Sequence, residues 1–197
     1  MGAGGHAAVI ADVLYQSGRL VKGFLDDRTE AGSEVLGVKV LGKLDSCSDY
    51  PECLFLIAIG YNEMRKRVSR TYPVEFGVAV HPSAIIGRQV EIGRGSVVMA
   101  GSVINVRTVI GEHCIVNTRA SIDHDNILGD YVHISPGAVL GGGVSIGTCT
   151  HIGLGACVRN TVEICGGVVV GAGASVVKDI TEPGTYIGVP AKRMSQR

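Results

Sequence analysis

Residues 110–140 read IGEHCIVNTRASIDHDNILGDYVHISPGAVL, and an aliphatic residue occupies every sixth position of this stretch. The same phase continues without a break through seventeen successive positions, from Val80 to Val176. A small or compact residue follows four places later in nearly every repeat, as Ala120 and Ala138 do, and glycine often comes directly after the aliphatic residue. A period of six fits neither an amphipathic helix nor a simple alternating strand.

A triangular coil accounts for this period, because three hexapeptides make one turn of about 18 residues with three flat faces. The aliphatic side chains then point inward, the small residues fit at the crowded corners, and successive coils stack about 4.8 Å apart through parallel-sheet hydrogen bonds. We therefore predict a parallel β-helix domain over residues 80–197, including a C-terminal tail. Residues 1–79 form a separate front domain.

The front domain has the pattern of a small parallel α/β unit of the Rossmann type. Apolar residues have helical spacing over residues 7–15 and 64–72, and residues 21–25 and 54–59 read as strands. The chain opens on the glycine-rich turn MGAGGH at residues 1–6. Such a turn normally follows a buried strand, so either the chain starts late or the first strand of this unit is missing.

This front unit carries the features of a nucleotide-binding pocket. Backbone N–H groups of the glycine turn and of the following helix N-terminus suit a diphosphate. Asp26 and Asp27 follow about 20 positions later, the spacing at which an acidic residue accepts a bond from a ribose or a base. Gly60 and Asn62 come at the end of the next strand, where α/β sheets bind ligands. Arg65 offers positive charge to the phosphates.

The composition excludes several classes of protein. Hydrophobic residues make up 46% and charged residues 18% of the chain, which excludes a disordered or highly charged binding protein. Equal numbers of basic and acidic residues argue against a general nucleic-acid surface. The cysteines form no C-x-x-C pair, and no apolar run of about 18 residues occurs. We expect reduced thiols in a cytoplasmic protein without a membrane span.

His124 is the strongest candidate for a general base. It comes two places after the inward-facing Ile122, so its side chain should point out of the prism. Asp123 and Asp125 flank it, and a carboxylate can fix the tautomer of an imidazole and stabilise its protonated form. Gly142 follows one full coil later and should stack directly over His124, about 4.8 Å along the prism axis.

The whole chain resembles the sugar acetyltransferases of the PglD and sialic-acid O-acetyltransferase type, whose hexapeptide repeats form a left-handed β-helix. The matching segments are residues 2–6, 25–27, 57–63, 81–84, 117–118, 123–125, 133–138 and 188–192. This resemblance implies an acetyl-CoA-dependent N-acetyltransferase in bacterial glycan synthesis. Its substrate would be a nucleotide-linked amino sugar of the UDP-4-amino-4,6-dideoxy type, and its active sites would lie between the subunits of a homotrimer.

The resemblance also implies roles for catalytic residues. His124 aligns with the general base, Asn117 with an assisting polar residue, and the backbone N–H of Gly142 with the donor to the oxyanion. Asp125 stands where the family has Glu, one methylene longer. The role of orienting His124 therefore stays open between Asp125 and Asp123.

Two further sets of residues follow from the same alignment. Contacts to acetyl-CoA align with His133, Leu154 and Ala172. Lys178 and Lys192 are positive side chains that suit the phosphates of CoA. Contacts to the nucleotide sugar align with Gly5, His6, Asp26, Asp27, Gly60 and Arg65. Since His133 lies half a coil from His124, these two side chains can meet only across a subunit interface.

Three alternatives share parts of this pattern. A zinc-dependent carbonic anhydrase of related fold needs three histidines around one metal. The 38 residues between His113 and His151 are too many for one zinc within one chain, so we expect no metal. A sugar O-acetyltransferase of the sialic-acid type would use the same His124, and the sequence does not separate amine from hydroxyl acceptors. The third alternative is a non-catalytic nucleotide-sugar-binding scaffold.

Overall fold

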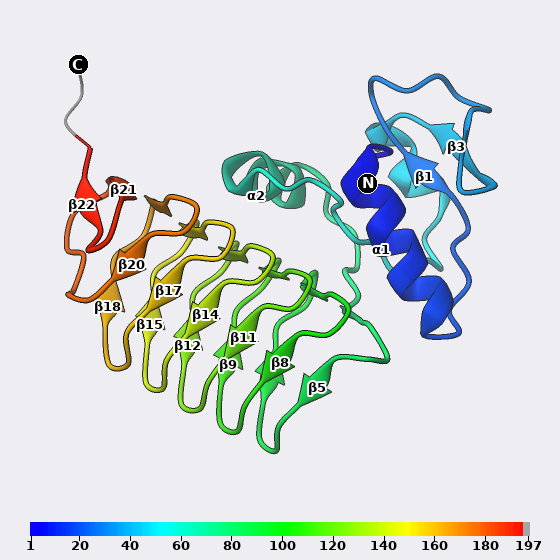
Figure 1. Ribbon diagram of the computed structural model, residues 1–197. Helices are drawn as coiled ribbons and strands as arrows, with labels where there is room; N and C mark the ends of the chain where they lie inside the picture. Colours follow the sequence, from blue (N-terminus) through cyan, green and yellow to red (C-terminus); the bar gives the residue numbers. More distant parts are fainter. Residues whose placement is uncertain (195–197) are drawn as a thin grey trace.

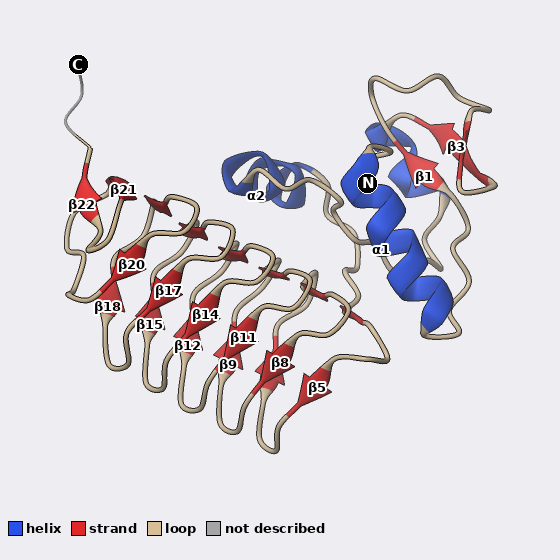
Figure 2. Ribbon diagram, in the orientation of Figure 1, coloured by secondary structure: helices blue, strands red, loops and turns tan. Residues whose placement is uncertain are grey.

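The computed structural model describes residues 1–194 and consists of a small α/β unit followed by a parallel β-helix (Figure 1). The α/β unit and the parallel β-helix that the sequence predicts are therefore both confirmed. Figure 2 shows that the helices belong to the front unit, whereas the coils alternate short strands with turns. None of the helices in the described range is long and apolar enough to cross a bilayer.

Three parallel sheets form the faces of the β-helix, and strands 18 residues apart pair in register, as Ile115 does with His133. The strands of the eight-stranded sheet are β4 Ala79–Val80, β7 Val97–Val98, β10 Ile115–Val116, β13 His133–Ile134, β16 His151–Ile152, β19 Val168–Val170, β21 Gly184–Ile187 and β22 Lys192–Arg193, of which β22 is antiparallel to β21. The strands of the six-stranded sheet are β5 Ile85–Ile86, β8 Val103–Ile104, β11 Ser121–Ile122, β14 Val139–Leu140, β17 Cys157–Val158 and β20 Ser175–Val176. The strands of the five-stranded sheet are β6 Glu91–Ile92, β9 Val109–Ile110, β12 Ile127–Leu128, β15 Ser145–Ile146 and β18 Glu163–Ile164.

The predicted aliphatic positions fill the prism. Ile104, Ile122 and Ile134 are fully buried, and the other inward residues from Val98 to Val176 belong to the same core cluster. The first coil departs from this pattern, since Ile86 is 37% exposed. Within residues 1–194 no coil stacks on its open edge, where β4, β5 and β6 end the three sheets.

The corners of the prism repeat with the same period as the core. Every sixth residue from position 89 to position 173 has a positive φ, in the left-handed region. Glycine occupies many of these positions because it meets no Cβ penalty there. Arg107 (φ 59°) and Asp125 (φ 59°) are non-glycine residues at such corners, one coil apart. The backbone at a corner turns sharply and carries its side chains to the outside.

The front unit departs from the all-parallel sheet that its pattern predicts. Its elements are α1 Gly5–Gln16, β1 Phe24–Leu25, β2 Glu34–Val35, β3 Val38–Gly42, the 3₁₀ helix η1 Leu44–Asp49 and α2 Asn62–Thr71. The sheet order is β1-β3-β2, in which β1 and β3 are parallel but β2 and β3 form an antiparallel hairpin. The predicted strand at residues 54–59 makes a single bridge, from Phe55 to Phe76.

The front unit packs on the outer face of the eight-stranded sheet. Ile10 and Val13 of α1 share one apolar cluster with Ala79, Val97 and Ile115 of the first three strands of that sheet. This contact fixes α1 against the β-helix and sets where the front unit meets the coils.

Candidate active site

The His124 side chain lies outside the prism, at the corner between β11 and β12, with about half of its surface exposed. The Asp123 side chain accepts a hydrogen bond from the His124 backbone N–H (2.8 Å) and a second from Asn105 Nδ2 (2.9 Å). Asn126 is fully buried beneath this corner, and its Nδ2 donates to the carbonyls of Asp123 (2.6 Å) and Gly141 (3.0 Å). Local hydrogen bonds therefore fix the backbone on both sides of the imidazole.

Asp125, rather than Asp123, contacts the imidazole. Its Oδ2 lies 2.6 Å from Nδ1 of His124. Arg107, the corner residue one coil earlier, holds the same carboxylate through two hydrogen bonds, from Nε (2.6 Å) and Nη2 (2.8 Å). These bonds from Arg107, and then the one from His124, hold the pKa of Asp125 well below its usual range. The carboxylate therefore stays ionised and can stabilise an imidazolium.

Gly142 stacks over the imidazole, as the spacing of one coil predicts. A Cβ at this position would lie 2.7 Å from both Cε1 and Nε2 of His124, closer than real Cβ atoms approach other atoms. Within the described chain the Gly142 N–H has no hydrogen-bond partner. A cavity of about 630 Å³ opens here, lined by residues 123–125 and 141–143 and by the next corner at Arg159, Asn160 and Thr161. The absence of a side chain on Gly142 keeps Nε2 of His124 accessible.

A second group of polar residues lies on another face of the prism, toward the front unit. His133 in β13 and His151 in β16 stack with their ring centroids 4.6 Å apart. Asn117 Nδ2 donates to Nε2 of His133 (3.2 Å), whose Nδ1 donates to the Gly60 carbonyl (3.3 Å). Burial, then the charges of His151 and Arg65, lower the pKa of His133 to about 3. The His133 side chain is therefore neutral near pH 7.

His133 and Asn117 thus belong to the eight-stranded face, whereas His124 follows a strand of the six-stranded sheet. One chain therefore does not bring these candidate residues together. His6, in the first turn of α1, is near enough to His133 for its charge to lower the pKa of His133 slightly. Its Nε2 is buried without a hydrogen-bond partner, and burial lowers its pKa to about 4.

The structure does not support the predicted roles of Arg65 and Asn62 in the nucleotide site. The Arg65 side chain is 1% exposed, and its guanidinium donates to the carbonyls of His113 (2.7 Å) and Tyr131 (2.8 Å), which are corner residues of successive coils. The same guanidinium donates to the carbonyls of Ile59 (2.9 Å) and Gly60.

Asn62 continues this contact to the next corner. Its Oδ1 accepts a bond from Arg65, and its Nδ2 donates to the Cys149 carbonyl (2.9 Å). Both side chains join α2 to the β-helix because their donors are already paired with protein oxygens. Neither is free to contact a phosphate.

Asp26 and Asp27 do line a cavity, of about 510 Å³, together with Gly2, Tyr61 and residues of α2. Asp26 accepts hydrogen bonds from the backbone N–H groups of Ala3, Arg28 and Thr29. Burial alone would raise the pKa of Asp26, but these hydrogen bonds lower it below its usual value. Asp27 is exposed and accepts one bond, from the Leu44 N–H (3.0 Å). Gly5 is exposed on the first turn of α1, outside this lining.

Four of the five residues expected to contact CoA lie on the outer surface, whereas His133 is only 9% exposed. Leu154 (57% exposed) and Ala172 occupy equivalent corners one coil apart, and the Gly173 N–H donates to the Leu154 carbonyl (2.8 Å). Lys178 and Lys192 are exposed near the C-terminal end of the coils, where β22 completes the eight-stranded sheet. The described residues contain no group of three or more His, Cys, Asp or Glu side chains that would hold a metal ion.

Comparisons with known proteins show which family this chain belongs to. The model of the PglD N-terminal domain family matches residues 1–72. The acetyltransferase domain of PglB from Neisseria gonorrhoeae is 39% identical, with a TM-score of 0.93, over 98% of this chain and 97% of that one. The chain belongs to the PglD family of hexapeptide-repeat sugar acetyltransferases.

Other known proteins are similar to this chain as well. PerB from Caulobacter crescentus, solved with CoA and GDP-perosamine, is 38% identical with a TM-score of 0.93 and covers 98% of this chain and 95% of its own. UDP-N-acetylbacillosamine N-acetyltransferase from Bacillus subtilis is 38% identical over 107 residues, which are 51% of this chain and 50% of that protein. The alignments thus span half or less of the curated relatives.

Sequence reasoning missed three residues of the His124 corner. Arg107 holds Asp125, Asn105 holds the Asp123 carboxylate, and Asn126 holds the backbone from inside. The signal for the first two lies in the 18-residue spacing, since 107 + 18 gives 125 and 105 + 18 gives 123. The same arithmetic that placed Gly142 one coil after His124 would have placed both of them.

Proposed function

We propose that the protein transfers the acetyl group of acetyl-CoA to the amino group of a nucleotide-linked sugar, with His124 as general base. The observation that carries this proposal is the exposed His124 imidazole, bonded to Asp125 through Nδ1 and stacked under Gly142. Its Nε2 has no hydrogen-bond partner in the described residues and can take the proton that a reacting amine loses.

Each part of the corner has a role in this reaction. The sugar amine attacks the thioester carbonyl while Nε2 of His124 takes the proton that the nitrogen loses. Asp125 keeps the proton of the neutral imidazole on Nδ1 and stabilises the imidazolium. The unpaired Gly142 N–H donates to the oxygen that becomes negative in the tetrahedral intermediate. Collapse of that intermediate forms the amide and releases CoA as a thiolate, which is then protonated.

The acceptor is proposed as a UDP-linked 4-amino-4,6-dideoxy sugar used in bacterial glycan synthesis. The Bacillus relative, named for UDP-N-acetylbacillosamine, supports the UDP-linked class, whereas PerB was solved with GDP-perosamine. The cavity lined by Asp27 and Gly2 is proposed to hold the nucleotide. Leu154, Ala172, Lys178 and Lys192 are proposed to hold CoA. The reaction is proposed to take place in the cytoplasm.

A homotrimer with active sites between subunits is part of the proposal. His124 and the Asn117–His133 pair lie on different faces of one chain, so a neighbouring chain is needed to bring them to one substrate. Outward-facing apolar side chains such as Ile127 (58% exposed) and Val139 (42% exposed) are available for burial between coils. Mixing His124→Ala subunits with His133→Ala subunits should restore part of the activity that each variant lacks, because some mixed interfaces regain both histidines.

The experiment that tests the activity is CoA thiol release from acetyl-CoA, measured against a panel of UDP- and GDP-linked 4-amino sugars. His124→Ala should lower kcat by about 10²- to 10⁴-fold and leave the Kd for the nucleotide sugar unchanged. His81→Ala, on the first coil, serves as the matched control. No release with any sugar in the panel would contradict the proposal. Binding without turnover in the unmodified protein would identify a scaffold.

A further inference from the structure

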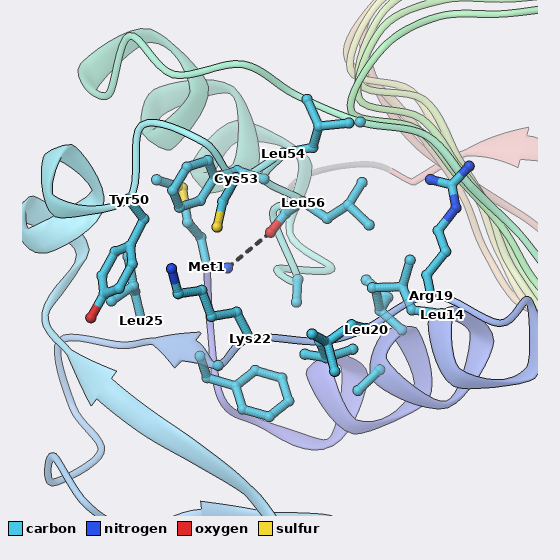
Figure 3. Close-up of a pocket in the computed structure, with 18 of the residues that line it drawn as sticks. Met1, Leu14, Arg19, Leu20, Lys22, Leu25, Tyr50, Cys53, Leu54 and Leu56 are labelled. Atoms are coloured by element: carbon cyan, nitrogen blue, oxygen red, sulfur yellow. Dashed lines mark hydrogen bonds between the residues drawn. The ribbon is translucent and has the colours of Figure 1, made fainter.

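Two cavities of similar size differ in what lines them. The cleft beside Met1, of about 610 Å³, lies within the front unit and is lined mainly by apolar side chains such as Leu54 and Leu56 (Figure 3). The cavity of about 630 Å³ at the His124 corner is lined instead by glycine backbone and polar side chains. The Asn126 side chain is fully buried beneath this second cavity, where it can act on the proposed reaction.

Asn126 makes four hydrogen bonds from inside the prism. Its Nδ2 donates to the carbonyls of Asp123 (2.6 Å), Gly141 (3.0 Å) and His124 (3.2 Å). Its Oδ1 accepts from the Val144 N–H (3.1 Å). Residues 123 and 124 belong to the corner of the proposed base, and residue 141 belongs to the corner one coil later. One side chain therefore joins the two corners.

Two threonines at other small-residue positions of the repeat make only part of this pattern. Thr108 and Thr150 each donate to the carbonyl 15 residues later (2.9 Å in both) and accept from the N–H 18 residues later (3.3 Å in both). Asn126 makes the same two bonds, to the carbonyl of Gly141 and from the N–H of Val144. Its bonds to the carbonyls two and three residues earlier are additional.

An apolar side chain would also fit the position of Asn126. The corresponding positions of the next two coils hold Val144 and Val162, each 1% exposed and part of the core cluster. Burial of an amide is unfavourable unless its polar atoms are paired. The additional bonds of Asn126 go to the backbone that carries His124, and valine could not make them.

We propose that Asn126 is a positioning residue for the reaction, because it fixes the separation between the His124 imidazole and the Gly142 N–H. Through the carbonyls of Asp123 and His124 it holds the backbone of the base, and through the Gly141 carbonyl it holds the residue before the oxyanion donor. A base and a donor that act on one substrate need a fixed separation, since a displacement of about 1 Å can lower the rate about a hundredfold. This inference rests on the proposed function.

Asn126→Thr tests the proposal. A threonine hydroxyl should keep the two bonds that Thr108 makes one coil earlier and lose the bonds to the carbonyls of residues 123 and 124. In the thiol-release assay, kcat should fall about five- to twentyfold, whereas the KM for the nucleotide sugar should hardly change. An unchanged kcat would overturn the proposal.

Ser96→Ala is the matched control. It removes two bonds of the same kind, to the Gly111 carbonyl and from the Cys114 N–H (2.8 Å each), at a different corner of the prism, between β6 and β7. Ser96→Ala should lower Tm at least as much as Asn126→Thr does, because it loses both bonds, yet leave kcat unchanged. An equal fall of kcat in the two variants would show that Asn126 acts through general stability, which would overturn the proposal.

The His124→Ala background separates positioning from other effects on the rate. Because this variant has no imidazole to position, adding Asn126→Thr should change its residual kcat less than about twofold. A further loss of about fivefold or more in this background would also overturn the proposal.

Hydrogen exchange gives a readout that needs no substrate. The Gly143 N–H donates to the His124 carbonyl (2.9 Å), which Asn126 also holds. In Asn126→Thr the Gly143 amide should exchange at least about tenfold faster, while the Val144 amide keeps an acceptor and its rate. Equal exchange of the Gly143 amide with and without the substitution would overturn the proposal. Faster exchange without thiol release from the unmodified protein would support the role of Asn126 at this corner and contradict only the proposed reaction.

Discussion

Oδ2 of Asp125 lies 2.6 Å from Nδ1 of His124, and the same carboxylate is held on its other side by Arg107. The orienting role that the sequence leaves open between two aspartates therefore falls on Asp125. The shorter side chain reaches the imidazole because Asp125 is a corner residue with a positive φ, next to His124 in the chain. Aspartate is among the residues that tolerate this backbone conformation best.

Arg107 should act as a positioning residue for this pair. Arg107→Met should lower kcat about two- to fivefold, the range expected when a half-exposed ion pair is lost. The pKa of Asp125 rises toward its usual value in this variant, but the carboxylate stays ionised above pH 5, so the pH–rate profile from pH 5 to 9 should become lower without changing its shape. Thiol release measured from pH 5 to 9 checks both effects.

The matched control for Arg107 is Arg94→Met, which breaks an ion pair of the same kind with Glu112, also 18 residues later. This pair lies away from His124, so kcat and the pH profile should stay unchanged. Equal effects of the two substitutions would show that Arg107 acts through general stability and not through Asp125.

Gly142→Ala should lower kcat by roughly a hundredfold. The added Cβ would lie 2.7 Å from Cε1 and Nε2 of His124, so the ring must move, and a misplacement of about 1 Å has a cost of this size. The KM for the nucleotide sugar should hardly change. Thr161→Ala alters the wall of the same cavity without approaching the ring, so it should leave kcat nearly unchanged. Full activity of Gly142→Ala would mean that His124 need not occupy its observed position.

Arg65→Lys should lower the free energy of unfolding by about 2–4 kcal/mol. An ammonium group cannot replace the planar fork, so several buried carbonyls at the contact between α2 and the β-helix lose their donors. Urea denaturation followed by circular dichroism measures this loss. Arg70→Lys, an exposed change on the same helix, should have little effect. If the two variants were equally stable, Arg65 would not join the two units.

Stability should fall as the pH drops from about 6.5 toward 4. Burial depresses the pKa of His133 to about 3 and that of His6 to about 4, so the unfolded chain binds protons in this window that the folded chain excludes. Each such histidine contributes a loss of about 1.4 kcal/mol per pH unit. The stabilisation is fully present above pH 6.5, and Tm measured against pH follows it.

His133→Gln tests whether buried histidines cause this loss of stability. It should flatten the slope of Tm against pH between pH 6.5 and 4.5. His81→Gln, at a more exposed histidine on the first coil, should leave that slope as it is. An unchanged slope in His133→Gln would place the acid sensitivity elsewhere.

The sequence by itself determined the β-helix, because the period of six is a local constraint that every coil repeats. Inward burial of Ile122, the outward His124 and the stacking of Gly142 over it all follow from that period. The sequence also predicted the glycine turn and the aspartates that line the cavity proposed to hold the nucleotide.

Only the tertiary structure decided where side chains from different elements meet. In the sequence, Arg65 looks like a phosphate ligand and Asn62 like a ligand contact at the end of a strand. Both instead donate to corner carbonyls of the β-helix because α2 lies along that corner. The bonds of Arg107 to Asp125 and the open cleft at Met1 also depend on how separate segments pack. A repeat fixes position along a coil, but long-range hydrogen bonds depend on the direction of each side chain, which no spacing along the chain specifies.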